Sequence, residues 1–311
     1  MNPMNTIRIG TRNSPLAMWQ ALEVEQKVRN LGYATEIVSV TSLGDKNLTQ
    51  PLYQMNVVGV FTKDLDIALL NHEIDIAAHS LKDVPTVLPR EIVLSAVLER
   101  DHESDILIRN PKKESQKGVF DDLYIGTGSL RRRAFWKAKY PHVRFDDIRG
   151  NVQTRLSKLE SENFDGTVFS LAGIKRLELP LQYEILDFII PAPAQGVVAV
   201  TSLREHHELT EILTNLNHQD TQICVEIERE FLNVLEGGCT APIGAIAKIK
   251  NDEIHFKAGI VSLDGTKKVL FDEVFPVAEH TFKGKELADK AKKLGAEKII
   301  EEIKALNKKT F

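Results

Sequence analysis

Cys239 is one of only two cysteines in the 311-residue chain, and its neighbours are unusual for a thiol. Two glycines precede it and a proline follows three positions later, so it must lie on a turn and not inside a helix or a central strand. An exposed thiol can act as a nucleophile or carry a covalent group, although a structural loop cysteine is equally compatible with this sequence. Cys224 lies on the apolar face of a predicted helix with Ile227 and Phe231, which favours a buried, inert side chain.

A concentration of positive charge between residues 129 and 155 could bind an anion. The segment has eight basic and two acidic residues, whereas the whole chain has a net charge of -4. Ser129, Arg131 and Arg132 begin a predicted helix, where free backbone N–H groups favour anions, and guanidinium groups bind carboxylates or phosphates in a bidentate manner. Most basic runs are only solvated surface. Here, arginines also follow other predicted strands, namely Arg12, Arg149, Arg155 and Arg176. We therefore expect a ligand with several carboxylates or phosphates.

Asp83 is a lone acid that follows the predicted strand 74–78. Beside Lys82 and before a proline, it could be an ordinary turn residue. In a cleft lined by arginines it could instead transfer protons or stabilise a developing cation. His79, just before this turn, is expected to orient the loop and not to catalyse.

Alternating strands and helices must position these side chains. This alternation predicts two α/β lobes with parallel sheets, in which ligands bind beyond the carboxyl ends of the strands. We expect residues 197–200 to return the chain to the first lobe as an added strand. The strands expected in the two lobes are residues 7–10, 35–41, 74–78, 123–126, 143–148 and 167–171.

A third domain begins after residue 217. A helix over 221–235 is expected to stop at Gly237 and Gly238, and a last helix is expected over 283–307. Alternating strands are expected between them at 245–249, 254–262 and 268–275. The predicted domains are residues 1–99 with 196–217, residues 100–195, and an α+β domain over 218–311 that carries Cys239.

The composition excludes several classes of function. Hydrophobic residues make up 42% of the chain and charged residues 27%, which is typical of a soluble globular protein. The N-terminus has no targeting pattern and no apolar run is long enough to cross a bilayer, so we predict a cytoplasmic protein without membrane contact. The net charge argues against nucleic-acid binding. The histidines are not spaced with the cysteines as metal ligands, so no metal is predicted.

Seven motifs follow one another along most of the chain. They are GTRNSPLA at 10–17, FTKDL at 61–65, HSLKDVP at 79–85, GTGSLRR at 126–132, RGNVQTRL at 149–156, AGIKR at 172–176 and LEGGCTAPIG at 235–244. In this order and combination they strongly resemble the hydroxymethylbilane synthase family, also called the porphobilinogen deaminases.

The resemblance implies a transferase of tetrapyrrole biosynthesis, on the path to porphyrin and heme. Its dipyrromethane cofactor would be attached through a thioether to Cys239 and would prime the polymerisation of four porphobilinogens with loss of ammonia. Hydroxymethylbilane would then be released by hydrolysis. Every ring carries an acetate and a propionate, which explains the need for arginines. The implied fold has two doubly wound lobes like those of periplasmic binding proteins, with the C-terminal domain presenting the cofactor.

The resemblance also assigns roles to individual residues. Asp83 would be the catalytic carboxylate at every cycle. Residues that would hold the cofactor are Cys239, Lys82, Asp83, Thr127, Ser129, Arg131, Arg132, Arg149 and Arg155. Residues that would bind substrate or the growing chain are Arg12, Ser14, Gln20, Arg149, Arg155, Arg176 and Gln195.

The sequence departs from the family pattern at three places. Residues 56–60, NVVGV, replace a loop that many members make glycine-rich and lysine-containing. Gly128 stands where many members have serine, and residues 192–195 also differ slightly. These changes concern lid contacts and elongation and leave the chemistry in place.

A non-catalytic anion-binding module on a binding-protein-like scaffold is the alternative. It accounts for two lobes and for the arginines, but it leaves Cys239 and the third domain without a purpose. We therefore predict a monomeric hydroxymethylbilane synthase whose partner is porphobilinogen.

Overall fold

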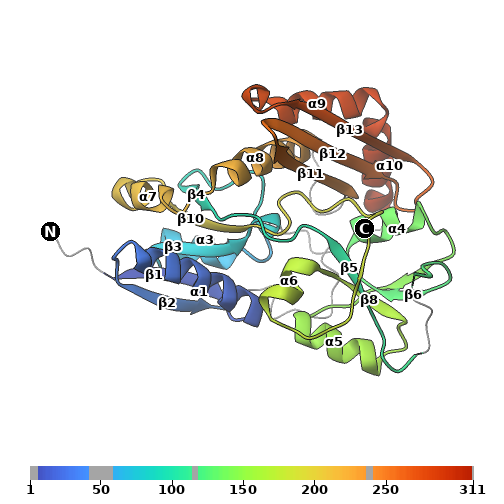
Figure 1. Ribbon diagram of the computed structural model, residues 1–311, viewed down its shortest axis with the longest axis horizontal. Coiled ribbons are helices and arrows are strands. Elements are labelled where there is room, and N and C mark those ends of the chain that lie inside the picture. Colours follow the sequence, from blue (N-terminus) through green and yellow to red (C-terminus); the bar gives the residue numbers. More distant parts are fainter. Residues whose placement is uncertain (1–5, 42–58, 114–117, 236–240, 310–311) are drawn as a thin grey trace.

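The computed structural model describes residues 6–41, 59–113, 118–235 and 241–309, with side chains through residue 306. Two five-stranded sheets and one three-stranded sheet form separate layers, each with its own helices (Figure 1). The predicted fold class, two doubly wound α/β lobes followed by an α+β domain, is confirmed.

The first lobe has the strand order β2-β1-β3-β10-β4. Side chains of α1 and α7 pack on one face of this sheet with Ile9 and Val200, and those of α3 pack on the other face with Ala77. Helices on both faces bury nearly all of the apolar sheet surface, as a doubly wound fold requires. The elements are β1 (Ile7–Arg12), α1 (Pro15–Asn30), β2 (Thr35–Val40), α3 (Lys63–Leu70), β3 (Ile76–Ser80), β4 (Ile92–Val97), β10 (Val198–Leu203) and α7 (His207–Thr214).

The second lobe repeats this arrangement with the order β7-β6-β8-β5-β9. Helix α4 packs on one face around Trp136, whereas α5 and α6 pack on the other around Leu159 and Ile174. The elements are β5 (Asp105–Arg109), β6 (Tyr124–Gly126), α4 (Leu130–Lys137), β7 (Arg144–Asp146), α5 (Val152–Ser161), β8 (Gly166–Ser170), α6 (Leu171–Arg176) and β9 (Glu184–Ile185).

The expectation of parallel sheets is wrong at one strand in each lobe. Strand β10 is antiparallel to β3 and β4, and β5 is antiparallel to β8 and β9. Both strands arrive from the other lobe, through residues 98–104 and 186–197. A strand delivered in this way makes no βαβ crossover on its own sheet, so nothing forces it to run parallel. The predicted return of the chain to the first lobe is confirmed by β10.

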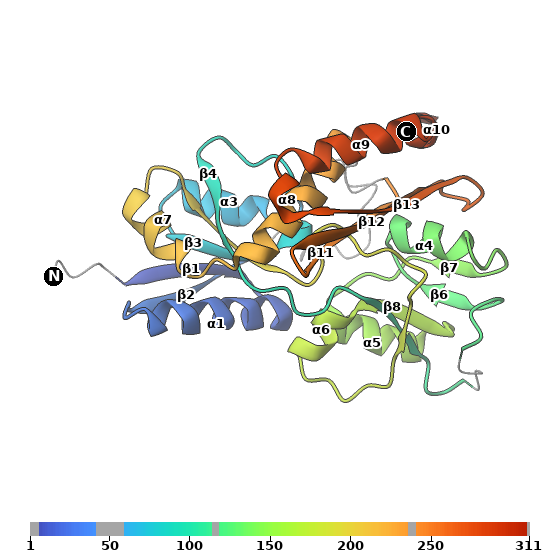
Figure 2. The same cartoon turned by 45° about the horizontal axis from the view of Figure 1, so that its top comes forward.

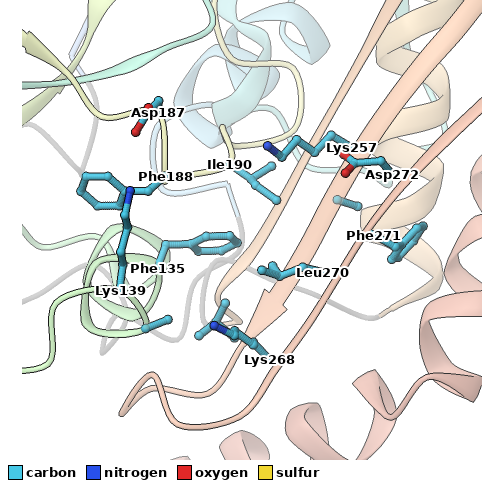
Figure 3. A pocket seen from close by; sticks show the side chains of 13 residues that line it. Phe135, Lys139, Asp187, Phe188, Ile190, Lys257, Lys268, Leu270, Phe271 and Asp272 are labelled. Atoms are coloured by element: carbon cyan, nitrogen blue, oxygen red, sulfur yellow. The ribbon is translucent and has the colours of Figure 1, made fainter.

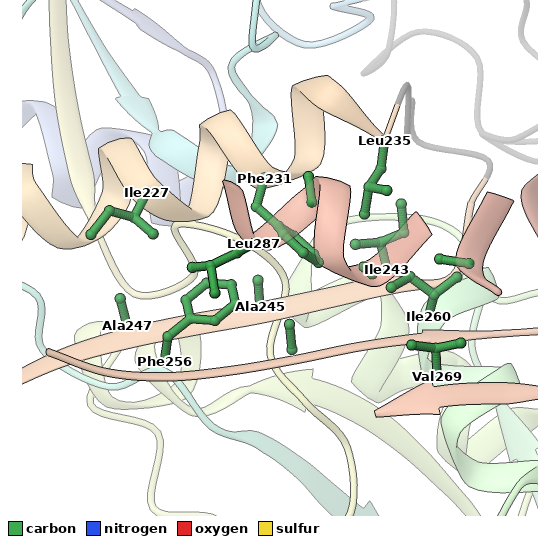
Figure 4. Close-up of a cluster of buried hydrophobic side chains, with 14 of the residues drawn as sticks. Ile227, Phe231, Leu235, Ile243, Ala245, Ala247, Phe256, Ile260, Val269 and Leu287 are labelled. Carbon is green, nitrogen blue, oxygen red and sulfur yellow. The ribbon is translucent and has the colours of Figure 1, made fainter. Parts of the chain in front are cut away.

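The third domain is an antiparallel sheet of β11 (Ile243–Lys250), β12 (Glu253–Val261) and β13 (Lys268–Pro276). One face is covered by α8 (Gln219–Val234), α9 (Lys283–Lys293) and α10 (Ala296–Lys309), and the other faces α4 (Figure 2). Phe231 from α8 and Leu287 from α9 meet Phe256 and Ala245 in its core (Figure 4).

The single helix predicted over 283–307 is wrong. The chain breaks into α9 and α10 at Gly295, whose φ of 105° lies in the left-handed region that ends helices. Helix α8 ends at Val234. Its predicted terminators, Gly237 and Gly238, and the cysteine that follows them, Cys239, lie outside the described residues, as do residues 56–58 of the departing loop.

Candidate active site

The predicted polar residues lie where strands of both lobes end. Lys82 and Asp83 form a 3₁₀ turn, η2 (Leu81–Asp83), directly after β3. Arg131 and Arg132 lie in the first turn of α4, after β6. The charges of Lys82 and Asp83 act on Arg132 across the two lobes, so these strand ends face one another.

Lys82, Arg131, Arg132 and Gln195 form a cluster with Asp105, the first residue of β5, at its centre. Its carboxylate is fully buried and accepts hydrogen bonds from Arg131 Nη1 at 2.6 Å, from Arg132 Nη2 at 2.8 Å and from Gln195 Nε2 at 3.2 Å. Burial alone would raise the pKa of this carboxyl, but the two guanidinium groups hold it well below its usual range. Sequence reasoning missed Asp105. Its only signal is an acid at the head of an otherwise apolar strand segment, 105–108.

Lys82 connects the first lobe to this centre. Its ammonium group donates to Gln195 Oε1 at 3.2 Å, and Gln195 Nε2 donates to Glu103 O at 2.6 Å as well as to Asp105. Burial lowers the pKa of Lys82 to about 8, against the opposing effect of Asp83. Gln195 has no exposed surface, and both ends of its amide are bonded within the protein.

The cluster carries more positive than negative charge. Arg131 and Arg132 are each 8% exposed and also donate to Ile190 O and Val168 O, which fixes the two guanidinium planes. The carboxylate of Asp83 is exposed beside them. The cations outnumber the two carboxylates, Asp105 and Asp83, and are held rigidly at the strand ends. They form a site for a polyanion.

Arg155 extends this charge along α5. It donates to Val168 O at 2.5 Å, lies 4.2 Å above the ring of Phe169, and has its pKa lowered to about 9 by burial. Its Nε is buried and has no hydrogen-bond partner among the described residues. Arg149, after β7, is 8% exposed, and burial lowers its pKa.

The start of α4 is shaped by two hydroxyl side chains. Ser129 is the N-cap and accepts from Arg132 N at 3.4 Å, while the buried Thr127 accepts from Ser129 N at 3.3 Å. A Cβ on Gly128 would meet Asp147 Oδ1 at 3.5 Å, an ordinary contact, so the Cβ of a serine would fit here.

Four of the residues assigned to substrate, Arg12, Ser14, Gln20 and Arg176, lie in or next to α1 and α6. The Arg12 guanidinium is 4.2 Å from the ring centre of Phe61, and Arg176 donates at 2.8 Å to both Asp101 and Gly196 O. Ser14 caps α1 by accepting from Ala17 N at 3.3 Å. Gln20 is 3% exposed, and its Nε2 has no partner among the described residues.

Cys224 is buried, as expected, and His79 is buried as well. His79 Nε2 lies 3.1 Å from Thr201 Oγ1, and burial lowers the pKa of the imidazole to about 4, so the ring is neutral at neutral pH. Its contact supports an orienting role. Cys224 is 5% exposed, and burial raises the pKa of its thiol to about 12.

Two other features lie away from the cluster. A cavity of about 380 Å³ lies between α4 and the third sheet, lined by Phe135, Phe188, Leu270 and Lys257 among others (Figure 3). Near the amino end of β3, ligand atoms of His72, Glu205 and His206 all lie within 4.8 Å of one another, a spacing that a metal ion could use. Among the described residues, no helix is both long and apolar enough to span a bilayer.

Two family models match the chain. "Porphobilinogen deaminase, dipyromethane cofactor binding domain" matches residues 7–211, and "Porphobilinogen deaminase, C-terminal domain" matches residues 222–297. A probable porphobilinogen deaminase of Methanocaldococcus jannaschii is 45% identical, covering 88% of this chain and 96% of the relative. The porphobilinogen deaminase of Desulforamulus reducens is 38% identical, covering 96% of this chain and 98% of that protein.

Solved structures with a similar trace include periplasmic and extracellular binding domains. The BvgS VFT2 domain of Bordetella pertussis has a TM-score of 0.42 at 14% identity, covering 68% of this chain and 86% of that one. The probable amino-acid ABC transporter binding protein ytmK of Bacillus subtilis has a TM-score of 0.43 at 11% identity, covering 68% and 90%.

Proposed function

Because the chain belongs to the porphobilinogen deaminase family, and is thus a transferase that makes hydroxymethylbilane in porphyrin and heme biosynthesis, we propose that its cation cluster holds the dipyrromethane cofactor beside Asp83. The observation that carries this proposal is the arrangement of Arg131, Arg132 and Lys82 around the buried carboxylate of Asp105. The cluster keeps unbalanced positive charge at the strand ends.

The chemistry of these residues fits the cofactor. Both of its rings carry an acetate and a propionate, and guanidinium and ammonium groups are the side chains that bind carboxylates most strongly. The buried Nε of Arg155, without a partner among the described residues, is a donor that a carboxylate could satisfy. We propose that Thr127, Ser129 and Arg149 complete the cofactor site.

Cys239 is proposed as the attachment point. In the chain it lies after α8 and before β11, and so belongs to the third domain. When bound, the cofactor supplies the primer to which porphobilinogen units are added.

Asp83 is proposed to act on each porphobilinogen in turn. Its carboxylate is exposed, beside the ammonium group of Lys82 and within the field of Arg132. In this position it would stabilise the cation that remains when ammonia leaves porphobilinogen. After the carbon–carbon bond forms, the same carboxylate would accept the proton that the pyrrole ring must lose.

The remaining residues are proposed to bind the carboxylates of porphobilinogen and of the growing chain. Arg12 and Arg176 are supported by the rings of Phe61 and Trp19, 4.2 and 5.2 Å away, which orients their guanidinium groups. Gln195 would act through Lys82 and Asp105, to which it is bonded. The full proposed set is Arg12, Ser14, Gln20, Arg149, Arg155, Arg176 and Gln195.

We also propose the domain limits and the setting. The limits are residues 1–99 with 196–217, residues 100–195, and residues 218–311. They fall in the two connections between the lobes, 98–104 and 186–197, and before α8. A cytoplasmic monomer that takes up porphobilinogen as a small molecule is the proposed working form.

Intact-protein mass spectrometry and turnover assays test these roles together. Purified wild-type protein should exceed its sequence mass by the cofactor, Cys239→Ser should have the bare mass, and Asp83→Asn should keep the added mass but lose about 10²–10⁴-fold in kcat. The exposed Asp289→Asn is the control and should behave as wild type. Active wild-type protein of bare mass would refute covalent attachment, and full activity of Asp83→Asn would refute the role of Asp83.

A further inference from the structure

Arg229, on α8 of the third domain, contacts the turn that carries Asp83. Its guanidinium group donates to Val84 O at 2.9 Å and to Pro85 O at 2.7 Å, with a longer bond of 3.4 Å to Leu81 O. These carbonyls lie on both sides of Asp83, so one side chain binds the backbone before and after the proposed catalytic residue.

Few other backbone bonds within the described residues fix this turn. The 3₁₀ turn has three residues, with backbone bonds from Val84 N to Leu81 O and from Leu81 N to Val197 O. Charge-assisted bonds from a guanidinium are about twice as strong as neutral ones, and Arg can offer several donors in one plane. Arg229 is half-buried, and burial lowers its pKa to about 10, so it remains charged at neutral pH.

A second residue of α8 reinforces the contact. Asn233, one helical turn after Arg229, accepts from Thr86 Oγ1 at 3.1 Å. The helix therefore binds residues 81–86 at two successive turns. Neighbouring Glu228 points elsewhere, to the Arg100 guanidinium and to the backbone of Ala194 and Ala247.

We propose that Arg229 is a positioning residue for Asp83, by which the third domain sets the place of the proposed catalytic carboxylate. The proposal rests on the proposed function of Asp83. Holding the carbonyls of Leu81, Val84 and Pro85 fixes the backbone of the turn, and a carboxylate displaced by about 1 Å loses up to about 100-fold in rate.

Chemical rescue tests the proposal. Arg229 lines an open cavity of about 690 Å³ with Thr86, Pro89 and Arg204, so a small guanidinium compound can reach the space that a truncated side chain leaves. Holoenzyme carrying Arg229→Ala should lose about 10–100-fold in kcat, with KM and the mass of bound cofactor unchanged. Methylguanidine at non-denaturing concentration should restore at least about tenfold.

Two further variants make the result specific. Arg204→Ala is the matched control: Arg204 lines the same cavity, is exposed and donates to Arg90 O, so its kcat should stay at the wild-type value with or without methylguanidine. Arg229→Lys, which keeps the charge and can reach one or two carbonyls, should fall between wild type and Arg229→Ala.

The outcomes distinguish the positioning role of Arg229 from the proposed role of Asp83, on which it rests. Wild-type kcat in Arg229→Ala, or a loss that methylguanidine leaves unchanged, overturns the positioning role. Asp83→Asn is assayed beside these variants. If it is fully active, the proposed function of Asp83 fails and the positioning role fails with it; if it is inactive, the Arg229 results stand on their own.

Discussion

Within the part of the chain that the structure describes, two carboxylates have no exposed surface, yet their pKa values move in opposite directions. The pKa of Asp105 is lowered, and that of Glu228 is raised. Asp105 is the first residue of β5, in the cluster proposed to hold the cofactor. Glu228 lies on α8, where it accepts from Arg100 at 2.8 Å and from the backbone N–H groups of Ala194 and Ala247 at 2.7 Å each.

The difference shows that neighbours, and not burial, decide the sign. Desolvation raises the pKa of both groups and is the largest contribution to each. At Asp105, Arg131, Arg132 and Lys82 together outweigh it. At Glu228 a single guanidinium and two amides do not.

This contrast distinguishes the proposed binding site from a contact between domains. Around Asp105 the cations exceed the acid, which suits the proposed binding of a ligand with further carboxylates. At Glu228 the charges balance, and the groups it binds come from both connections between the lobes and from the third domain. We expect the Asp105 cluster to govern ligand binding and Glu228 to govern how the domains are held together.

The strongest test of the contrast is Asp105→Ala. Removing one partner of a buried ion pair leaves uncompensated charge, here on Arg131 and Arg132, and should lower the free energy of unfolding by about 3–5 kcal/mol. Bound cofactor should also decrease. Urea denaturation and intact mass would measure both effects.

Added pyrophosphate supplies the control for this variant. It should recover part of the lost stability in Asp105→Ala, because an anion can replace the missing carboxylate, and should not stabilise variants of Glu228 in the same way. Unchanged stability of Asp105→Ala would show that the arginines do not depend on Asp105.

Glu228→Gln should have a smaller effect and leave the cofactor in place. The amide keeps one acceptor but brings an N–H group against a backbone donor, which costs roughly 1–3 kcal/mol. Because the pKa of Glu228 is raised, its ionisation disfavours the folded state, and wild-type stability falls as pH rises from 4.5 through that raised pKa. The decrease in the free energy of unfolding caused by Glu228→Gln should thus be largest at low pH and become smaller toward neutral pH.

Asp105 predicts the opposite pH dependence. Its lowered pKa adds stability above pH 3.8, and this stability is lost as pH falls below that value. Urea titrations of both variants between pH 3 and pH 7 would compare the two signs. Parallel curves for the two variants would contradict the contrast.

Much of the fold could be predicted from local sequence. Strands and their following turns were placed because apolar runs end in polar residues, as at residues 80–83 and 126–132. The same rule located most of the candidate site, since ligands meet parallel sheets at these ends. The helix break at Gly295 was missed, because a glycine inside an apolar period does not by itself reveal a left-handed residue.

The partners of the site residues could not be predicted in this way. Asp105 is 26 residues from Arg131, and Arg100 is 128 residues from Glu228, so nothing in the local pattern joins them. In the sequence, nothing distinguishes Arg229 from other basic residues on helices. Only the fold shows that it binds the carbonyls of Val84 and Pro85. The antiparallel direction of β5 and β10 likewise depends on where the chain crosses between the lobes, which the local sequence pattern does not show.

His79 extends the comparison to a buried base whose partner, among the described residues, is a hydroxyl group and not a carboxylate. Its ring lies 3.1 Å from Thr201 Oγ1, and burial and the charge of Arg12 lower its pKa from 6.5 to about 4. A lowered pKa means that the folded state resists protonation, so the stability that His79 contributes is present above pH 6.5 and is lost as pH falls toward 4. The loss of stability between pH 7 and pH 5 should be about 2 kcal/mol.

In His79→Gln, whose amide can keep the contact with Thr201 but cannot titrate, this part of the acid sensitivity should disappear. Urea denaturation at pH 7, 6 and 5 measures the difference. If wild type and His79→Gln lose stability equally over this range, protonation at His79 is not what destabilises the protein in mild acid.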